Sequence, residues 1–226
     1  WGRNPRGQLG TGSAGVSSPV PVLVAGGATW RSIDADGSNT CGVQEDGSAW
    51  CWGADNYAQL GDGANDYSST PAALSAVPVR VAGPSDWTSV RAGLTACGVA
   101  ADGTGWCWGS NANNQLGYQG TQGEQANEPV QVAGSWFDIT PGAGHVCGVQ
   151  TDGSGWCWGS ARFGQTGNES GVPVTNGPKR VLGDGGWTSV SAGYNHTCGT
   201  KSDATLWCWG ANEHGQLGDG TYETRS

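Results

Sequence analysis

The sequence contains no methionine, only two phenylalanines and few charged residues, which make up 13% of its 226 residues. So little charge is not typical of a helical protein, and 13 tryptophans are too many for a disordered one. No apolar run is long enough to cross a membrane as a helix, so membrane insertion is not expected. No signal peptide is visible, and the missing methionine predicts that the chain starts inside a longer precursor.

Basic side chains are also scarce, because 10 Lys and Arg face 19 Asp and Glu and leave a net charge of −9. The ten cations are scattered and form no patch in the sequence. Nucleic acids and anionic membranes both require a basic face, so no nucleic-acid partner is expected. The chain has no C-x-x-C pair of the kind that binds zinc, and its G-x-G pieces do not open helices as phosphate loops do. The sequence therefore predicts no metal and no cofactor.

Cysteine and tryptophan are concentrated in a segment that the chain repeats four times. Each copy holds two cysteines ten positions apart, with a tryptophan on either side of the second one, and the four copies contain all eight cysteines. The copies are CGVQEDGSAWCWG (41–53), CGVAADGTGWCWG (97–109), CGVQTDGSGWCWG (147–159) and CGTKSDATLWCWG (198–210).

An Asp-Gly pair in the middle of three of these copies predicts a β-hairpin. In the first copy the expected loop is 45–47, with Gly47 in the left-handed conformation. This register places Cys41 opposite Cys51 at a non-hydrogen-bonded position, where side chains approach within disulfide range. It also places the glycine after the first cysteine opposite a tryptophan, which gives the indole room to lie across the neighbouring strand. In the fourth copy Ala204 replaces the loop glycine at a cost of about 1 kcal/mol, which leaves the geometry of that turn open.

The cysteines are expected to form one disulfide within each hairpin. The alternative is eight reduced cysteines that act as small core hydrophobes, but the matching register with no cysteine left over favours disulfides. Each bond would contribute about 3 kcal/mol on the chain-entropy model and would persist only in an oxidising compartment, which predicts a secreted, extracellular protein. The flanking tryptophans should point to the opposite face of the sheet, where they can pack. The predicted pairs are Cys41–Cys51, Cys97–Cys107, Cys147–Cys157 and Cys198–Cys208.

A second motif gives the chain a period of about 50 residues. It reads WGRNPRGQLGTG at residues 1–12 and returns in similar form four more times, each time beginning with a Trp-Gly pair. The second repeat is longer, and its extra residues are expected in a loop around 65–76. The predicted repeats are 1–51, 52–107, 108–157, 158–208 and the opening of a fifth, 209–226.

Each repeat is expected to fold as four short antiparallel strands, the first of which follows a proline that suits the start of a strand. Four such strands in each period describe a β-propeller blade, and stacked blades bury the sheet faces that one blade leaves exposed. The recurring tryptophans are natural filler between blades, because an indole buries a large area. The strands expected in the second repeat are 79–81, 87–92, 95–99 and 105–109, and the other proline-led strands are 21–24, 129–132 and 178–181.

Two motifs resemble those of the regulator of chromosome condensation repeat family. The family's W-G-x-N-x-x-G-Q-L-G-x-G ending is similar to residues 1–12 and their later copies, and its A-G-x-x-H-x-C segment is similar to AGYNHTC at 192–198. The resemblance covers essentially the whole chain. It implies an all-β fold in which residues 1–226 form a single propeller domain or a segment of a seven-bladed propeller. A closed ring of four or five blades is the less favoured alternative.

This resemblance identifies a fold more than a function, and no catalytic set of residues stands out, so an enzyme is not expected. The first hypothesis is a secreted structural or protein-interaction module, stapled by its disulfides, whose partners are other proteins such as neighbouring subunits of an extracellular assembly. The second is a carbohydrate-binding propeller that presents exposed aromatic side chains to glycans. The third is guanine nucleotide exchange on a small GTPase, which the resemblance implies and oxidised cysteines disfavour. Aromatic candidates for glycan binding are Tyr57, Tyr118, Phe163 and Tyr222.

Several polar residues invite functional readings but are expected to be structural. DADGSN at 34–39 resembles the start of a calcium loop, but the other repeats lack its carboxylates, so a strand-to-strand turn is expected. His145 and His196 are expected to hydrogen-bond to a neighbouring loop, because Asn and Thr replace them in the other repeats. A glutamine that recurs in every repeat is expected to be a buried amide that pins the connecting loop of one blade to the next. These glutamines are Gln8, Gln59, Gln115, Gln165 and Gln216.

Two sequons fit an extracellular location. Asn168-Glu-Ser falls in a variable loop and Asn195-His-Thr falls in the turn between the second and third strands. Both asparagines are expected to be exposed and open to N-glycosylation in a eukaryotic secretory pathway.

Overall fold

The computed structural model describes residues 1–64, 73–117, 124–168, 174–183 and 185–225. The chain forms two compact units. No residue that the structure describes is helical, so this part of the chain offers no helix that could span a membrane. The first unit consists of Trp1–Ala101, Trp106–Ser110 and Gln125–Val130, and the second of Asp102–Gly105, Asn111–Glu124 and Gln131–Ser226.

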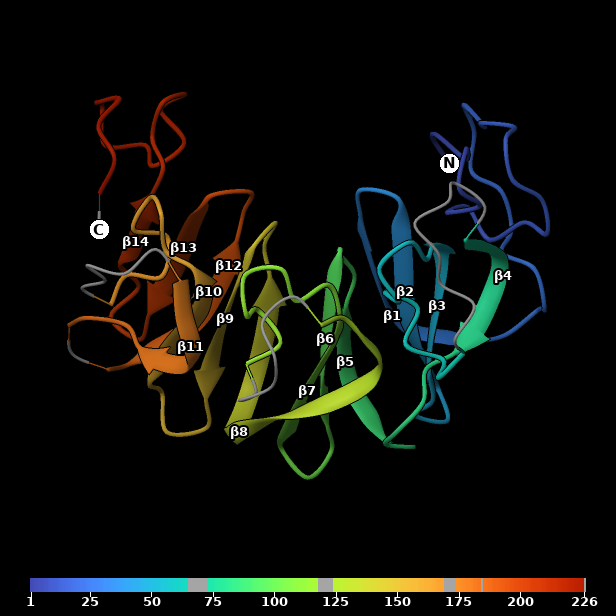
Figure 1. The fold of residues 1–226 in the computed structure, drawn as a ribbon, viewed down its shortest axis with the longest axis horizontal. Helices are drawn as coiled ribbons and strands as arrows, with labels where there is room; N and C mark the ends of the chain where they lie inside the picture. The colour runs from blue at the N-terminus through green and yellow to red at the C-terminus, as the bar shows by residue number, and fades with distance from the viewer. Residues whose placement is uncertain (65–72, 118–123, 169–173, 184, 226) are drawn as a thin grey trace. The chain divides into compact units, whose positions relative to one another are not determined.

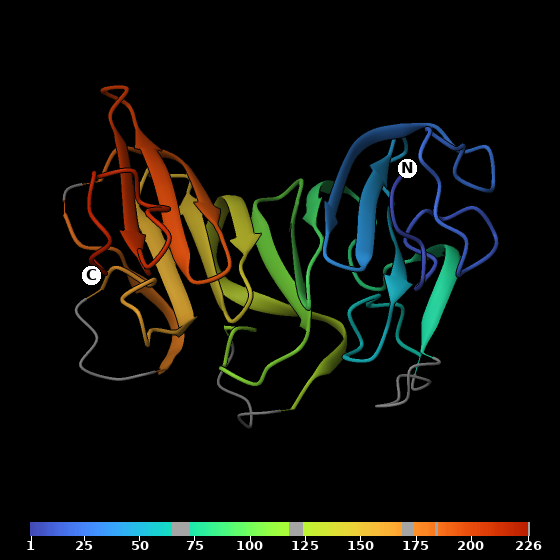
Figure 2. The ribbon, with the colours of Figure 1, turned by 90° about the horizontal axis from the view of Figure 1, so that it is seen from above.

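The described residues form fourteen β-strands, which makes the fold all-β, as the sequence predicts (Figures 1 and 2). Neighbouring strands within each unit pair antiparallel. In chain order the strands are β1 (Trp30–Asp36), β2 (Asn39–Gln44), β3 (Ala49–Ala54), β4 (Leu74–Arg80), β5 (Trp87–Arg91), β6 (Thr95–Ala100), β7 (Thr104–Gly109), β8 (Ala126–Pro141), β9 (His145–Gln150), β10 (Gly155–Ser160), β11 (Val174–Arg180), β12 (Trp187–Ala192), β13 (His196–Lys201) and β14 (Leu206–Gly210).

In the first unit, β1 to β4 form one sheet in the order of the chain. The outermost strand, β4, contains the proline-led segment 78–81 up to Arg80, which pairs with Trp50 of β3. The prediction that this segment opens the second repeat's own sheet is therefore wrong. It closes the sheet of the preceding repeat, so each sequence repeat contributes strands to two sheets.

The proline of this segment lies inside its strand rather than at the start, which corrects a second prediction. β4 begins at Leu74, and its register shifts between the pairs Cys51–Val79 and Gly53–Ser75, which leaves Pro78 in a bulge. β11 has the same irregularity opposite β10. A bulge on an outer strand accepts proline, because no ladder hydrogen bond is required of it there.

Residues 21–24 are the exception among the proline-led segments, because they form no strand. The residue after this segment is nevertheless bonded like the residue after segment 78–81. The N–H of Ala25 donates to the carbonyl of Gly10 at 2.8 Å, and the N–H of Ala82 donates to the carbonyl of Gly61 at the same distance. A strand also requires a partner, and none of the described strands pairs with this segment. The predicted strand is wrong here for lack of that partner.

The second unit contains two further sheets. In one of them the strand order is β8-β9-β10-β11, in which β8 contributes its later part. The last sheet has only three strands, in the order β12-β13-β14. On its outer side β14 is bridged at Gly210 by Arg225, and no other described strand pairs with it there.

Pairs of indoles pack within the sheets, whereas the sequence predicts tryptophan as filler between blades. The first strand of a sheet provides one ring and the third strand provides the other, with ring centroids between 5.4 and 5.8 Å apart. Such tilted or edge-on contacts stabilise beyond simple burial. The pairs are Trp30–Trp52, Trp87–Trp108, Trp136–Trp158 and Trp187–Trp209.

The glycine after each first cysteine makes room for one of these indoles, but not for the one that the sequence predicts. A Cβ atom on Gly42 would lie 2.8 Å from Cε3 of Trp30. The indole that crosses the glycine thus comes from β1, not from Trp50 on β3, because the indole pair is built on the first and third strands. Gly98, Gly148 and Gly199 are covered in the same way by Trp87, Trp136 and Trp187.

Candidate functional site

The four hairpins contain the four disulfides that their register predicts, and none of the cysteines is free. The Cα atoms of each pair are 4.1 Å apart, as expected for a non-hydrogen-bonded position. The six cysteines of the first three hairpins are fully buried, whereas Cys198 and Cys208 are half-buried. The disulfides therefore lie within the sheets and not on a surface that a ligand could reach.

The fourth hairpin adopts the same turn as the others, which settles the geometry that the sequence leaves open. Ala204 has a φ of 67°, close to the φ of 85° at Gly47, and Cys198 pairs directly with Cys208. In both loops the aspartate accepts hydrogen bonds from the residue two positions later, Asp46 from Ser48 and Asp203 from Thr205. These bonds hold the turn and lower the pKa of both carboxyls.

The two tryptophans that flank each second cysteine have different roles. Trp50 is half-buried, and its Nε1–H donates to Ser48 Oγ at 2.8 Å in its own hairpin loop. Trp52 is buried, and its Nε1–H donates to the backbone carbonyl of Gln8 at 2.9 Å, in a loop of the preceding repeat. The second tryptophan therefore joins neighbouring repeats. The same bond links Trp108 to Gln59, Trp158 to Gln115 and Trp209 to Gln165.

The recurring glutamines join the repeats mainly through their backbone carbonyls, although the predicted amide link is also present at Gln59, whose Nε2–H donates to Asn39 Oδ1 at 3.4 Å. Gln59 is buried, and its Oε1 accepts the N–H of Tyr57 at 2.7 Å within the same loop. Its backbone carbonyl accepts the indole of the following repeat. The Gln59 side chain therefore holds the conformation of its loop. In that conformation the Gln59 carbonyl is free to accept the hydrogen bond from Trp108 of the following repeat. The same side-chain bond is formed by Gln8, Gln115, Gln165 and Gln216.

His145 contacts the neighbouring repeat, as predicted. Its Nε2 lies 2.9 Å from Thr197 Oγ1, which itself donates to the carbonyl of Gln165 at 2.8 Å. Because that hydroxyl proton is committed to Gln165, Nε2 must carry the proton and donate to Thr197. The ring is fully buried and its Nδ1 has no partner among the described residues. Burial, with a smaller effect of nearby His196, lowers the pKa of His145 to about 3, so the ring is neutral and structural.

The remaining predicted sites are mostly less exposed than the sequence indicates. Asn168 is half-buried, and its Nδ2–H donates to the carbonyl of Cys157 at 3.2 Å. Asn195 is also half-buried, so the prediction that both sequons are exposed is wrong in degree, and glycosylation stays a prediction. DADGSN forms the expected turn between β1 and β2. In the described part of the chain, no group of three or more His, Cys, Asp or Glu is arranged to hold a metal.

The aromatic residues considered for glycan binding differ in their exposure. Tyr57 and Tyr222 are exposed, whereas Phe163 is half-buried. Tyr118 lies outside the described residues.

The exposed residues that differ between repeats are the best candidates for contact with a partner. Turns between the first and second strands of each sheet carry Leu94 after β5 and Tyr194 after β12, which are 46% and 78% exposed. Residues that recur in all repeats are engaged in loops and disulfides, so they are not free for recognition. We name Leu94 and Tyr194 the turn positions. An exposed tyrosine on a rigid turn is typical of protein-binding surfaces.

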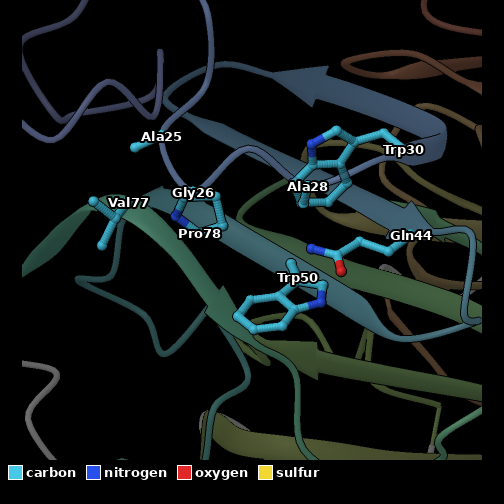
Figure 3. Close-up of a pocket in the computed structure, with 8 residues that line it drawn as sticks. All are labelled: Ala25, Gly26, Ala28, Trp30, Gln44, Trp50, Val77 and Pro78. Carbon is cyan, nitrogen blue, oxygen red and sulfur yellow. The ribbon is translucent and has the colours of Figure 1, made fainter.

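A shallow cavity of about 360 Å³ opens beside β1 in the first unit. Figure 3 shows Trp30 and Trp50 on either side of Gln44, with Pro78 and Val77 of β4 to one side. The lining is mainly apolar and bears no charged group. This chemistry suits an apolar or backbone contact more than a charged ligand.

Comparisons with known proteins agree with this architecture. Residues 46–99 and 187–216 match the regulator of chromosome condensation (RCC1) repeat. The ultraviolet-B receptor UVR8 of Arabidopsis thaliana is 28% identical over 235 residues, which cover 99% of this chain and 51% of the receptor. Prp20p from Saccharomyces cerevisiae has a similar structure, with a TM-score of 0.79 at 21% identity over 100% of this chain and 57% of Prp20p.

A third similar structure is the ectodomain of the receptor kinase CR4 from Physcomitrella patens, with a TM-score of 0.55 at 20% identity over 86% of this chain and 44% of the ectodomain. The chain thus spans about half the length of these relatives. The repeats, the sheet topology and the relatives lead to one assignment. The chain carries regulator of chromosome condensation repeats at residues 46–99 and 187–216, and its all-β fold of antiparallel sheets is similar to that of β-propellers with such repeats.

Proposed function

We propose that this chain is a secreted, non-enzymatic propeller that binds other proteins and is stapled by its intra-blade disulfides. The observation that carries the proposal is that four in-register disulfides use all eight cysteines, three of them in fully buried positions. Reducing compartments do not maintain such bonds. A disulfide in every hairpin suits a protein that works outside the cell.

Protein binding is supported by a difference between recurring residues, which are engaged within the fold, and variable residues, which are exposed. Histidine, glutamine and tryptophan positions that recur are engaged in loops and blade junctions, and the turn positions Leu94 and Tyr194 remain exposed. Prp20p has binding properties toward Gsp1p and histones, and the CR4 structure is an ectodomain. Propellers of this family thus include protein binders and extracellular domains, and we extend both properties to this chain.

Secretion is tested by non-reducing peptide mapping of the protein purified from its native source under alkylating conditions. The expected result is four intra-hairpin disulfide peptides and no alkylated cysteine. Eight alkylated thiols would contradict the secreted location, because the bonds would then not exist in the protein's own compartment.

Partner binding is tested by capture from the extracellular fraction of the source organism on immobilised chain. We expect Tyr194→Ala to lower capture of the specific partner about ten-fold, since exposed tyrosines at turns are frequent hot spots. Val16→Ala, which removes an equally exposed apolar side chain outside the turn positions, is the matched control. Equal capture by the unchanged chain and both variants would reject Tyr194 as a binding residue.

A further inference from the structure

The outer strand β11 of the second unit contains the one Asn-Gly pair in the sequence, Asn176-Gly177 (Figure 1). Every other asparagine of the chain is followed by a residue that carries a side chain. Because glycine has no Cβ atom, its backbone nitrogen is the least hindered in approaching the side chain of the residue before it. Asn176 is therefore the asparagine of this chain that is best suited to react with its own backbone.

The hydrogen-bonded ladder of the sheet does not hold this pair. The register shifts between Cys157 and Gly159 of β10, so residues 176–178 of β11 have no register partner among the described strands. Gly177 has a φ of 75°, outside the extended range, and Pro178 has no N–H to donate. The peptide between Asn176 and Gly177 can thus rotate without breaking a ladder pair.

The bulge itself does not require an Asn-Gly pair. In the first unit the register of β3 and β4 shifts in the same way between Cys51 and Gly53, which leaves residues 76–78 without a register partner. There the first two residues are Ala76 and Val77, followed by proline as in β11. The fold therefore explains the bulge, but not the reactive pair that β11 places in it.

A second asparagine activates the side chain of Asn176. Asn176 is exposed, and its Oδ1 accepts a hydrogen bond from Nδ2 of Asn114. Asn114 is fixed by its own loop, where its N–H donates to the carbonyl of Asn111 at 3.1 Å and its φ is 58°. A donor on Oδ1 stabilises the negative charge that develops on this oxygen when a nucleophile adds to Cγ.

We propose that Asn176 is a site of spontaneous deamidation that Asn114 assists. The backbone nitrogen of Gly177 attacks Cγ of Asn176 and gives up its proton. The new N–Cγ bond closes a five-membered succinimide, the Cγ–Nδ2 bond breaks, and the side-chain nitrogen leaves with that proton as ammonia. Water then opens either carbonyl of the ring, which yields aspartate or isoaspartate at position 176. Both products add one negative charge to the net charge of −9.

The two products should affect β11 differently. Aspartate keeps the backbone unchanged, and its carboxylate still accepts the hydrogen bond from Asn114. Isoaspartate routes the main chain through the side-chain carbons and lengthens it within the bulge. The pair Gly159–Thr175 on one side of the bulge and the pair Cys157–Lys179 on the other must then shift relative to each other. Isoaspartate is therefore expected to weaken the pairing of the outer strand.

The proposal is tested by incubating the folded protein in mildly alkaline buffer and following it over time by anion exchange and peptide mapping. The mapping uses fragmentation that distinguishes aspartate from isoaspartate. We expect the peptide that contains residue 176 to lose its amide and to give both products. The peptides of Asn195 and Asn212 should keep their amides over the same period, because His196 and Glu213 follow them. An amide at Asn176 that is as durable as these two would overturn the proposal.

Other repeats of the chain provide the matched variants. Gly177→Val introduces the residue of β4 and should suppress the reaction at least ten-fold. A Cβ at this position meets only the carbonyl of Gly117 at 3.5 Å, so space for it exists. Asn114→Ala introduces the residue of the equivalent loop, where Ala58 holds a φ of 60°. It should slow the reaction about ten-fold, the effect of one hydrogen bond to a developing charge.

Asn113→Ala, which removes the neighbouring amide from the same loop, is the control for Asn114→Ala and should leave the rate unchanged. In urea the unchanged chain and Asn114→Ala should react at the same rate, because unfolding separates the two asparagines. Equal rates of these two proteins in the folded state, or a difference that persists in urea, would overturn the role of Asn114. An undiminished rate in Gly177→Val would show that its backbone nitrogen is not the nucleophile.

Thermal unfolding of each variant confirms that it is folded before its rate is compared. This inference is independent of the proposed secretion and of the proposed binding of other proteins. Its failure would leave both of those proposals intact.

Discussion

The β2–β3 hairpin and the β13–β14 hairpin share the same cysteine, tryptophan and aspartate positions but lie in different surroundings. Both have the same loop conformation, the same pairing of cysteines and the same Cα separation across the disulfide. Cys41 and Cys51 are fully buried, whereas Cys198 and Cys208 are half-buried. Trp207 is also more exposed than Trp50. A hairpin's own residues thus set its shape, and the strand and the sheet beside it set its burial.

The largest expected effect is a difference in stability between two tryptophan variants. Trp108 joins two repeats, whereas Trp207 lies on the outer side of β14. Trp108→Ala removes a fully buried indole and its bond to Gln59, so we expect a loss of about 3–5 kcal/mol in the free energy of unfolding. Trp207→Ala removes a half-exposed indole and should cost less than about 1 kcal/mol. Urea unfolding monitored by tryptophan fluorescence measures both at concentrations where the chain is a monomer. Similar losses would contradict the difference in burial.

The next effect concerns pH and the buried His145. Since the folded pKa is about 3 and the ordinary value is about 6.5, only the unfolded chain binds a proton between these values. Stability is therefore full above pH 6.5 and falls by about 1.4 kcal/mol per pH unit below it, or about 2.7 kcal/mol by pH 4.5.

His145→Asn sharpens this test, because Asn39 occupies the equivalent position in the first repeat. We expect the slope of melting temperature against pH between 6.5 and 4.5 to become shallower in this variant. His214→Asn, which changes an exposed histidine, is the control and should keep the slope. An unchanged slope in His145→Asn would show that the buried ring is not its cause. The hairpin aspartates contribute in the same direction at lower pH, since their pKa values are also depressed.

A smaller effect should distinguish the disulfides by their accessibility. Cys198–Cys208 is half-buried, so we expect dithiothreitol to reduce it about ten-fold faster than the three buried bonds. Timed alkylation followed by peptide mapping gives the order. Reduction of all four bonds at one rate would indicate that global unfolding, and not local burial, controls access.

The smallest effect tests the loop residue in which the two hairpins differ. Ala204 holds a left-handed φ of 67°, so Ala204→Gly should stabilise the protein by up to about 1 kcal/mol. Gly47→Ala is the matched reverse change and should destabilise by a similar amount, with some extra cost from the nearby backbone of Asp86. Thermal unfolding measures both changes. A destabilised Ala204→Gly variant would mean that the alanine side chain forms a contact that outweighs its strain.

The features that the sequence predicts well are local ones. The hairpin loop, the alternation of side chains and the spacing of ten residues fix which cysteines meet, because all of this is encoded between residues 41 and 53. The period of the tryptophan motifs likewise indicates propeller blades. A hydrogen bond of His145 to the neighbouring repeat is also predicted and is observed, although its partner Thr197 lies on β13 and not in a loop.

The features that the sequence predicts poorly depend on contacts between repeats. The sequence predicts that residues 78–81 form the first strand of the second repeat. In the structure they pair with β3 of the preceding sheet, with a bulge at Pro78. The glutamine amide is predicted to be the link between blades, and Gln59 Nε2 does donate to Asn39, but the link that recurs is formed by the glutamine carbonyl. In both cases the sequence pattern identifies the correct residue but not its main contact in another repeat, because the spacing of residues along the chain carries no information on such contacts.

The sequence by itself determined the repeat, the hairpins and the pairing of all eight cysteines, since turn chemistry and strand alternation act over about a dozen residues. Only the tertiary structure decided that Trp30, and not Trp50, lies across Gly42, and that the outer strands β4 and β11 come from the repeat that follows their sheet. It also decided how deeply each disulfide is buried. These outcomes depend on which sheet lies next to which, and packing between distant segments, not local conformational preference, determines that choice.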